Sequence, residues 1–309
     1  MSELRNEIAW SWSRDKTLRR CARQYYWHYY GTWGSWWDDA PAEVKHAARL
    51  KRLTNFDLLV GDAIHKAIAR ALLHRPAQPC FMPEDAIAED AQRLFEIAGQ
   101  QAELADAYYG VPGLPERRAL AEAKLAHCLE GLRACTWAKR LFRVPRSRLR
   151  WLDDAAAPFE ARMVNTEGGY TLFGAPDVAV EDREGRLHVI DWKTGKRDDS
   201  DRLQLTAYAL FLALKLNLNL DRIHGHLVYL LDPPGRQVES AGVLEDVAPV
   251  LGMITDLYAD VRSRLSDVER NIAGDIERFE MTEHFGICAR CNFRELCGRS
   301  ASEPSATDQ

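Results

Sequence analysis

The chain has 309 residues, of which 46% are hydrophobic and 28% charged, and its formal net charge is −5. This is the composition of a globular protein with room for one large domain or two smaller ones. No run approaches the roughly 18 apolar residues of a membrane helix, and the opening MSELRNEIAW lacks the basic flank and apolar run of a secretory signal. We therefore expect a cytoplasmic protein, in which 7 cysteines favour metal ligands or buried thiols over disulfides.

The negative net charge by itself weakly disfavours a nucleic-acid partner, but the charge is unevenly spread. Residues 14–23 are strongly basic, and residues 131–150, GLRACTWAKRLFRVPRSRLR, carry 7 Arg or Lys and no acid. Each stretch has the ordinary explanation of a solvated helix face. Residues 10–37 also hold 10 aromatic side chains.

The first half of the chain has helical patterns. Residues 13–30 are expected to form a helix with Ser13 as its N-cap and Gly31 as its stop. A second helix is expected over 60–74, with one apolar face made of Ile64, Ala67, Ile68 and Ala71. Ala-, Leu- and Glu-rich sequence from about 84 to 142, interrupted at 108–116, predicts a helical subdomain.

The pattern changes at about residue 148. PFEARMVN, YTLFGAPDVAVED and RLHVIDWKTG read as three successive strands, joined by the hairpin-like connections TEGG and REG. A helix over 200–216, a strand over 223–231 and a helix over 245–270 follow, and the polar tail from 299 is expected to be disordered. This order indicates a mixed α/β domain with a central sheet and helices at both ends.

Two acids and a lysine lie on adjacent predicted strands: Asp177 in FGAPDVAV, and Asp191 and Lys193 in HVIDWKTG. Residues i and i+2 of a strand point to one face, so Asp191 and Lys193 project together. Buried acids are costly when unpaired, and two acids beside a lysine suggest a hard cation such as Mg²⁺ or Mn²⁺. A metal beside a lysine suits phosphodiester hydrolysis, although a structural Asp–Lys salt bridge explains the spacing equally well.

Other residues could complete such a site. Gln204 and Tyr208 are spaced i, i+4 on the helix that follows the strands. His65 could supply an imidazole ligand, although a lone histidine on an apolar helix is more often a satisfied core residue. Glu160, in PFEARM, could be a further ligand or an exposed strand residue.

GDAIHKA, GAPD, IDWKTGK and QLTAYAL stand in this order along the chain. The series resembles the PD-(D/E)XK nuclease superfamily, in particular its RecB-like branch, whose motifs are a histidine on an early helix, G-x-x-D, D-x-K and Q-x-x-x-Y. The resemblance implies a restriction-endonuclease-like core, in which a central mixed sheet is flanked by helices. It implies that Lys193 is catalytic and that Gln204 and Tyr208 support the site and contact DNA. The metal ligands that it implies are His65, Asp177, Asp191 and the carbonyl of Trp192.

Three more cysteines stand in ICARCNFRELC: Cys288, Cys291 and Cys297. Structural zinc sites and iron–sulfur clusters are usually bound by four protein ligands. Some RecB-like nucleases hold an iron–sulfur cluster with one N-terminal and three C-terminal cysteines. Examples are the CRISPR-adaptation exonucleases and the AddB-type nuclease domains. The resemblance to them implies that Cys21 is the fourth ligand. Ala22 departs from this pattern, in which proline is usual.

All-thiolate ligation favours a [4Fe–4S] cluster over Zn²⁺. His28 and His284 are rival fourth ligands. Cys128 and Cys135 are expected in the core, and Cys80 is isolated.

The resemblance thus predicts five segments. They are an N-terminal helical part with Cys21 and His65 (1–74), a helical insertion (75–150), a nuclease core (151–270), an iron–sulfur segment that clasps the N- and C-terminal regions together (271–298) and a tail (299–309). The expected activity is metal-dependent hydrolysis of DNA, as an exonuclease preferring single-stranded or frayed ends, in DNA repair, CRISPR adaptation or phage and defence processing.

The basic helix and the aromatic residues fit a path for a single strand, along which bases stack and cations track phosphates. The rings of residues 25–30 are expected to pack internally, and Trp33, Trp36 and Trp37 to contact DNA or a partner. No P-loop is present, so helicase action would come from a partner. The alternative is a scaffolding subunit that binds single-stranded DNA and has little cleavage activity.

Overall fold

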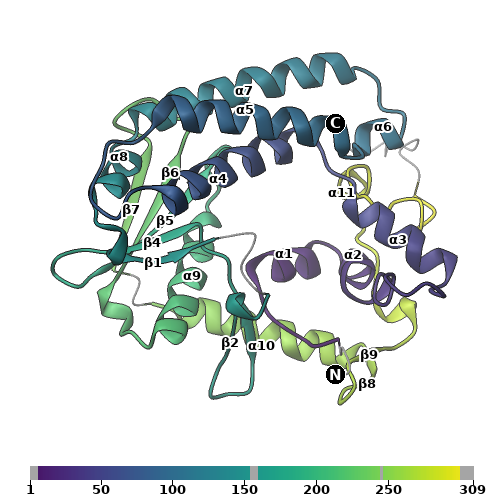
Figure 1. Ribbon diagram of the computed structural model, residues 1–309. Coiled ribbons are helices and arrows are strands. Elements are labelled where there is room, and N and C mark those ends of the chain that lie inside the picture. The colour runs from purple at the N-terminus through teal and green to yellow at the C-terminus, as the bar shows by residue number, and fades with distance from the viewer. Residues whose placement is uncertain (1–5, 154–158, 244–245, 300–309) are drawn as a thin grey trace. The chain divides into compact units, whose positions relative to one another are not determined.

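Figure 1 presents the computed structural model, which describes residues 6–153, 159–243 and 246–299. The chain forms two compact units, each made of segments that are distant in sequence. Unit 1 comprises residues 1–53, 167–172 and 251–309, and unit 2 comprises residues 54–166 and 173–250. The predicted tail is outside the described residues except for Arg299.

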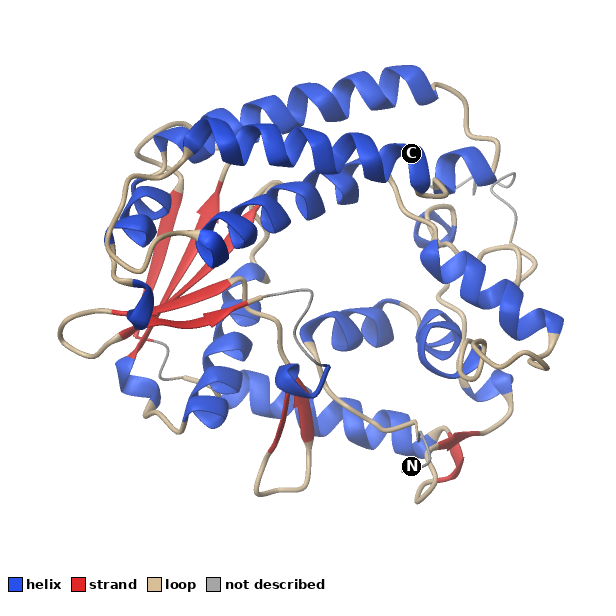
Figure 2. Ribbon diagram, in the orientation of Figure 1, coloured by secondary structure: helices blue, strands red, loops and turns tan. Residues whose placement is uncertain are grey.

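A five-stranded mixed sheet forms the centre of unit 2 (Figure 2). Its strands, in spatial order, are β1 (Leu149–Leu152), β4 (Val178–Glu181), β5 (Leu187–Lys193), β6 (Ile223–Tyr229) and β7 (Val238–Val243). β5 and β6 are parallel, and the other pairs are antiparallel. Parallel neighbours need a crossover connection, which the helix α9 (Asp201–Leu216) provides. β5 is buried on both faces, in keeping with its nearly continuous apolar sequence.

The helices of unit 2 are α4 (Phe56–His74), α5 (Glu84–Gln101), α6 (Ala105–Tyr108), α7 (Leu114–Ala134) and α8 (Thr136–Arg143). The predicted helical character of 84–142 is confirmed. The helix predicted over 60–74 begins earlier, at Phe56, because the Asn55 side chain caps it by accepting the Leu58 N–H at 2.9 Å.

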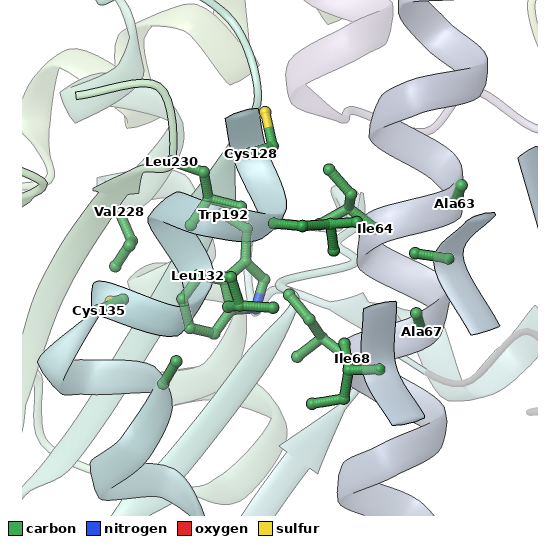
Figure 3. Packing of buried hydrophobic residues seen from close by; sticks show 14 of the residues in the cluster. Ala63, Ile64, Ala67, Ile68, Cys128, Leu132, Cys135, Trp192, Val228 and Leu230 are labelled. Atoms are coloured by element: carbon green, nitrogen blue, oxygen red, sulfur yellow. The ribbon is translucent and has the colours of Figure 1, made fainter. Parts of the chain in front are cut away.

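Each face of the sheet carries an apolar core. Trp192 and Val228 pack against Ile64 and Ile68 of α4 and Leu132 of α7 (Figure 3). Val189 and Leu227 point to the opposite face and pack against α9. Burial of each such side chain contributes roughly 1.5–3 kcal/mol.

A close backbone approach fixes α7 on the sheet. A Cβ atom at Gly131 would lie 1.9 Å from the carbonyl oxygen of Leu230, so only glycine fits there. The Gly131 carbonyl also accepts a hydrogen bond from the buried Gln237 side chain at 2.6 Å.

Unit 1 contains α1 (Trp12–Arg20), α2 (Ala22–Tyr26), the π-helical turn η1 (Trp27–Gly31), α3 (Ala42–Arg52) and α11 (Phe285–Cys288). It also holds the short strands β8 (Leu265–Asp267) and β9 (Ile272–Ala273) and the 3₁₀ turn η5 (Ile276–Arg278). The helix α10 (Ala248–Ser263) belongs to this unit from Leu251 onward.

The single helix predicted over 13–30 is wrong in two respects. The N-cap is Ser11, whose side chain accepts the Arg14 N–H at 3.2 Å. Cys21 interrupts the helix with extended backbone (φ −167°, ψ 114°), and its sulfur accepts the N–H of Thr282. The predicted end at Gly31 is confirmed.

The predicted strands also need correction. YTLFGAPDVAVED forms two strands, β3 (Thr171–Phe173) and β4, separated by GAPD. Gly174 lies against Phe211, where a Cβ atom would come within 2.6 Å of the ring, and Pro176 has no N–H for a ladder. PFEARMVN is mostly a 3₁₀ turn, η3 (Phe159–Arg162), before the short strand β2 (Met163–Asn165). The side chain of Glu160 is outside the described residues.

β7 was not predicted from the sequence, and the helix predicted over 245–270 ends at Ser263. The remaining 3₁₀ turns are η2 (Arg146–Arg148) and η4 (Leu220–Arg222). Within the described ranges, no helix is both long and apolar enough to cross a membrane.

Candidate functional site

Asp191 is a buried acid in the middle of the sheet of unit 2. It lies on β5 and is 4% exposed. Burial and the Asp177 carboxylate raise the pKa of Asp191 to about 6, against the opposing effect of Lys193. Its Oδ2 lies 2.8 Å from the Lys193 Nζ, but no hydrogen-bond donor among the described residues is aligned with it. Lys193 therefore supplies a positive charge to this carboxylate but no aligned hydrogen bond to Oδ2.

Lys193 is held from several sides. In addition to Asp191, its Nζ lies 3.0 Å from Asp201 Oδ1 and donates to Gln204 Oε1 at 2.6 Å. Burial lowers the pKa of Lys193, but the two carboxylates outweigh that effect and raise it, so the ammonium stays charged. The Gln204 amide in turn donates to the Tyr208 hydroxyl at 2.9 Å. The i, i+4 pair on α9 thus orients the lysine.

Asp177 precedes β4 and contacts two other predicted residues. Its Oδ1 lies 3.0 Å from His65 Nδ1, and its Oδ2 accepts the Trp192 N–H at 2.7 Å. Burial lowers the pKa of His65, but Asp177 and Asp191 overcome it and raise the pKa to about 9, so the imidazole is protonated. The side chain of His65 is 35% exposed, which excludes the core-histidine interpretation. The indole of Trp192 lies in the core (Figure 3).

Gly61 explains how α4 presents His65. A Cβ atom at Gly61 would lie 3.2 Å from the Thr194 hydroxyl, just beyond the end of β5. The glycine lets α4 come close to the strand end, and His65 follows one turn later on the same helix face.

Two acids of this site were not predicted from the sequence. Asp201, the first residue of α9, accepts hydrogen bonds from the Tyr229 hydroxyl at 3.0 Å and the Asp198 N–H at 3.2 Å, in addition to its contact with Lys193. In sequence it reads as an ordinary acid at a helix N-terminus. Only the packing of α9 on the sheet turns it toward the lysine.

The second acid is Asp153, which follows β1. Its N–H donates to the Asp177 carbonyl at 2.9 Å, and its carboxylate lies 2.7 Å from Arg162. Burial raises its pKa despite Arg162, and the nearby Asp177 adds to the rise. No strand was predicted before Asp153, so no signal distinguished it from loop acids.

A cavity of about 410 Å³ lies beside the site, and its lining includes His65, Asp153, Asp177 and Trp192 but not Asp191 or Lys193. Two carboxylates and an imidazole are a suitable donor set for a hard divalent cation. Asp191 Oδ2, which accepts no hydrogen bond from the described residues, is consistent with such a cation. The carboxylates are instead engaged by His65, Lys193 and the backbone. In this arrangement, no group of three or more His, Cys, Asp or Glu in the described ranges is disposed to hold a metal ion.

The four predicted cluster cysteines also come together, in unit 1. Cys21, Cys288, Cys291 and Cys297 line a cavity of about 20 Å³. His28 and His284 do not line it. Cys128 and Cys135 are fully buried in the apolar core of unit 2, which confirms that prediction (Figure 3).

Nitrogen donors point at three of these sulfurs. Cys21 Sγ accepts the Thr282 N–H and Cys291 Sγ the Phe293 N–H, both at 3.4 Å, and Arg299 contacts Cys288 Sγ at 3.5 Å. Burial, and then the neighbouring cysteines, raise the pKa of Cys291 to about 11. N–H donors suit thiolate ligands of a metal, which deprotonates such thiols when it binds.

Comparison with known proteins agrees with the geometry of unit 2. No curated protein matches the chain in a direct sequence comparison. The family model of the PD-(D/E)XK nuclease superfamily matches residues 9–298, nearly the whole chain. The mixed α/β fold with its five-stranded sheet is compatible with a restriction-endonuclease-like core. The chain belongs to the PD-(D/E)XK nuclease superfamily.

Proposed function

We propose that this protein is a RecB-like, metal-dependent DNA nuclease with an iron–sulfur cluster, acting as an exonuclease on single-stranded or frayed ends. Superfamily membership implies a nuclease, and nucleases of this superfamily typically use Mg²⁺ or Mn²⁺. The observation that carries the proposal is the ammonium of Lys193 beside the buried Asp191 carboxylate, with Asp177 and His65 close by.

His65, Asp177 and Asp191 would hold the metal, which when bound supplies a Lewis acid and an activated water. The Lys193 ammonium is placed to donate a hydrogen bond to a scissile phosphate oxygen or to the attacking water. Gln204, Tyr208 and Asp201 hold the ammonium in one position, so little reorganisation is needed when charge develops on the phosphate.

The preference for single strands is supported by residues of unit 1. α1 carries the exposed basic side chains Lys16, Arg19 and Arg20, and the turn after η1 exposes Trp36 and Trp37 by 50% and 52%. Exposed indoles and cations are the groups that stack bases and track phosphates in single-strand binding. Tyr25 and Trp27 are buried, as predicted, and do not contribute such a surface.

The cluster would be a [4Fe–4S] centre held by Cys21, Cys288, Cys291 and Cys297. Its ligands come from two segments that are more than 250 residues apart in sequence. The 3.4 Å contact of Cys21 with Thr282 shows that these segments meet in the fold. Its role would be structural, because ligand binding energy is folding energy when the ligands come from distant segments. If the anaerobically purified protein is colourless and contains stoichiometric zinc, the site binds Zn²⁺ and not an iron–sulfur cluster.

One observation favours the alternative of a DNA-binding scaffold with little cleavage. Asp177 and Asp191 already have cationic partners, His65 and Lys193, as a site that had lost its metal would require. In either case we propose a helicase or a CRISPR-adaptation protein as the partner, as the resemblance to the RecB-like branch implies.

The test is a panel of end-labelled substrates incubated with Mg²⁺, Mn²⁺ or EDTA. We expect metal-dependent shortening of linear single strands and frayed duplexes, and no cleavage of a closed single-stranded circle. Cleavage of the circle would replace the exonuclease assignment by an endonuclease. Tight single-strand binding without cleavage in either metal would favour the scaffold.

A further inference from the structure

A second cavity of unit 2, of about 450 Å³, lies at the other end of β4 and β5 from Asp177 and Asp191. It shares no lining residue with the cavity beside His65. His188, near the beginning of β5, lies on its wall, whereas Trp192, near the end of the same strand, lines the cavity beside His65. The cavity is therefore separate from the candidate active site.

Arginines surround this cavity. Arg140 and Arg143 come from α8, Arg148 from the turn η2, and Arg183 from the turn between β4 and β5. Three of them, Arg140, Arg143 and Arg148, belong to the basic stretch 131–150. The guanidinium of Arg140 lies over the Trp137 ring at 4.7 Å, and that of Arg143 over the Phe81 ring at 4.4 Å.

The acids around the cavity do not neutralise these arginines. Glu181 pairs with Arg150 at 2.5 Å, and Asp182 and Glu184 pair with Arg186 at 2.7 and 3.3 Å. In the described residues, no carboxylate forms an ion pair with Arg140, Arg143 or Arg183. The wall thus carries an excess of positive charge in a concave site, which attracts an anion.

The walls are rigid. The Asp182 carboxylate accepts the N–H groups of Glu184 at 3.0 Å and Arg186 at 2.8 Å, which fixes the β4–β5 turn. Arg148 donates to the Asp182 carbonyl, and Trp137 packs on the buried His226 ring at 4.1 Å. A preformed cavity loses little entropy on binding.

Apolar residues also line the cavity, namely Pro79, Leu141, Val144, Pro145 and Val180. A volume of this size falls in the range of small-molecule sites, roughly 300–1,000 Å³. This lining of apolar residues and arginines suits a ligand with a flat apolar body and a phosphate, since Arg pairs bidentately with phosphate oxygens.

We propose that this cavity binds the phosphate and base of a nucleotide, either a free mononucleotide or the phosphorylated end of a strand. Neither the nuclease chemistry nor a metal is needed for this binding, so the proposal stands independently of the activity.

The experiment is calorimetric titration of the full chain in EDTA with thymidine 5′-monophosphate, inorganic phosphate, and a 5′-phosphorylated or unphosphorylated oligothymidylate. The Arg140→Gln/Arg143→Gln variant is compared with Lys139→Gln, which changes one charge on the same helix at a residue that pairs with Glu84 outside the cavity. Circular dichroism confirms that each variant is folded.

We expect saturable binding of the mononucleotide, at least tenfold tighter than that of phosphate, tenfold or more weaker in the double variant and unchanged in Lys139→Gln. If only the 5′-phosphorylated strand binds in an arginine-dependent way, the ligand is a strand end. Absence of saturable binding, equal affinity in the double variant, or equal affinity for phosphate and nucleotide overturns the proposal.

Discussion

The carboxylate–lysine site of unit 2 and the cysteine cavity of unit 1 are organised in opposite ways. In the first, residues of β5 and α9, close in sequence, contact one another directly, and Lys193 has three polar partners at 3.0 Å or less. In the second, Cys21 and three cysteines from the far end of the chain line one small cavity, and no disulfide joins these four described residues. The first site is organised by contacts among its own side chains, and the proposed cluster would link the cysteines of the second.

The largest effect that separates the two sites concerns catalysis. Lys193→Met is expected to lower the rate of DNA hydrolysis by roughly 10³-fold, since positioned electrostatic stabilisation is worth about that much. It also leaves Asp191 and Asp201 without their shared cation, so the melting temperature of unit 2 should fall. Single-turnover hydrolysis and calorimetry measure both. Unchanged hydrolysis would remove the lysine from the mechanism.

The cysteine cavity should respond in iron content and stability. Cys21→Ser is expected to abolish cluster iron and to lower the free energy of unfolding by at least ~3 kcal/mol, because structural metal sites supply ~10 kcal/mol in small domains. Cys80→Ser, in unit 2, is the matched control and should retain both. If Cys21→Ser keeps its full iron content, Cys21 is not the fourth ligand.

A smaller effect tests how the fold holds the lysine. Asp201 contacts Lys193 and Tyr229, and Asp201→Asn preserves the shape of its side chain but removes the negative charge. We expect kcat to fall about tenfold with KM unchanged. The exposed Asp199→Asn, two residues away, should be neutral. An effect on KM alone would make Asp201 a binding residue and not a positioning one.

A further effect concerns the acid stability of unit 2, at a hydrogen-bonded chain of Asp182, His188, His226 and Ser240. His188 Nε2 lies 3.0 Å from Asp182 Oδ2, His188 Nδ1 lies 2.9 Å from His226 Nε2, and His226 Nδ1 lies 2.9 Å from the Ser240 hydroxyl. With Asp182 ionised, His188 donates to it and accepts from His226, which accepts from Ser240. Both rings are then neutral.

Burial, and then the neighbouring histidines and Arg140, lower the pKa of His226 to about 3. The unfolded chain, with a histidine pKa of about 6.5, binds the proton first, so stability is lost as the pH falls from about 6.5 toward 3. Between pH 7 and pH 5 the loss should be about 2 kcal/mol. Chemical unfolding at both pH values checks it, and His226→Gln should show a smaller difference. An equal difference in the variant would assign the acid sensitivity to other groups.

The two sites also differ in how far the sequence predicted them. The strand period pairs Asp191 with Lys193 and the helix period pairs Gln204 with Tyr208, the resemblance implies that the two pairs share a site, and the structure brings them into contact. Asp201 and Asp153 were not predicted as site residues, because their side chains reach the site only through the packing of α9 and β1. No local sequence pattern encodes that packing. The break at Cys21 was missed because its neighbours have helical propensity, and the contact with Thr282 that accompanies the extended backbone is 261 residues distant.

The central claim, that unit 2 carries a metal-dependent nuclease site at Asp191, is tested most directly by metal-dependent cleavage of a labelled single strand. The wild-type chain and Asp199→Asn should shorten it in Mn²⁺ and not in EDTA, while Asp191→Asn, with an unchanged or higher melting temperature, should cleave at least 10³-fold more slowly. Equal cleavage by Asp191→Asn and the wild type would contradict the account.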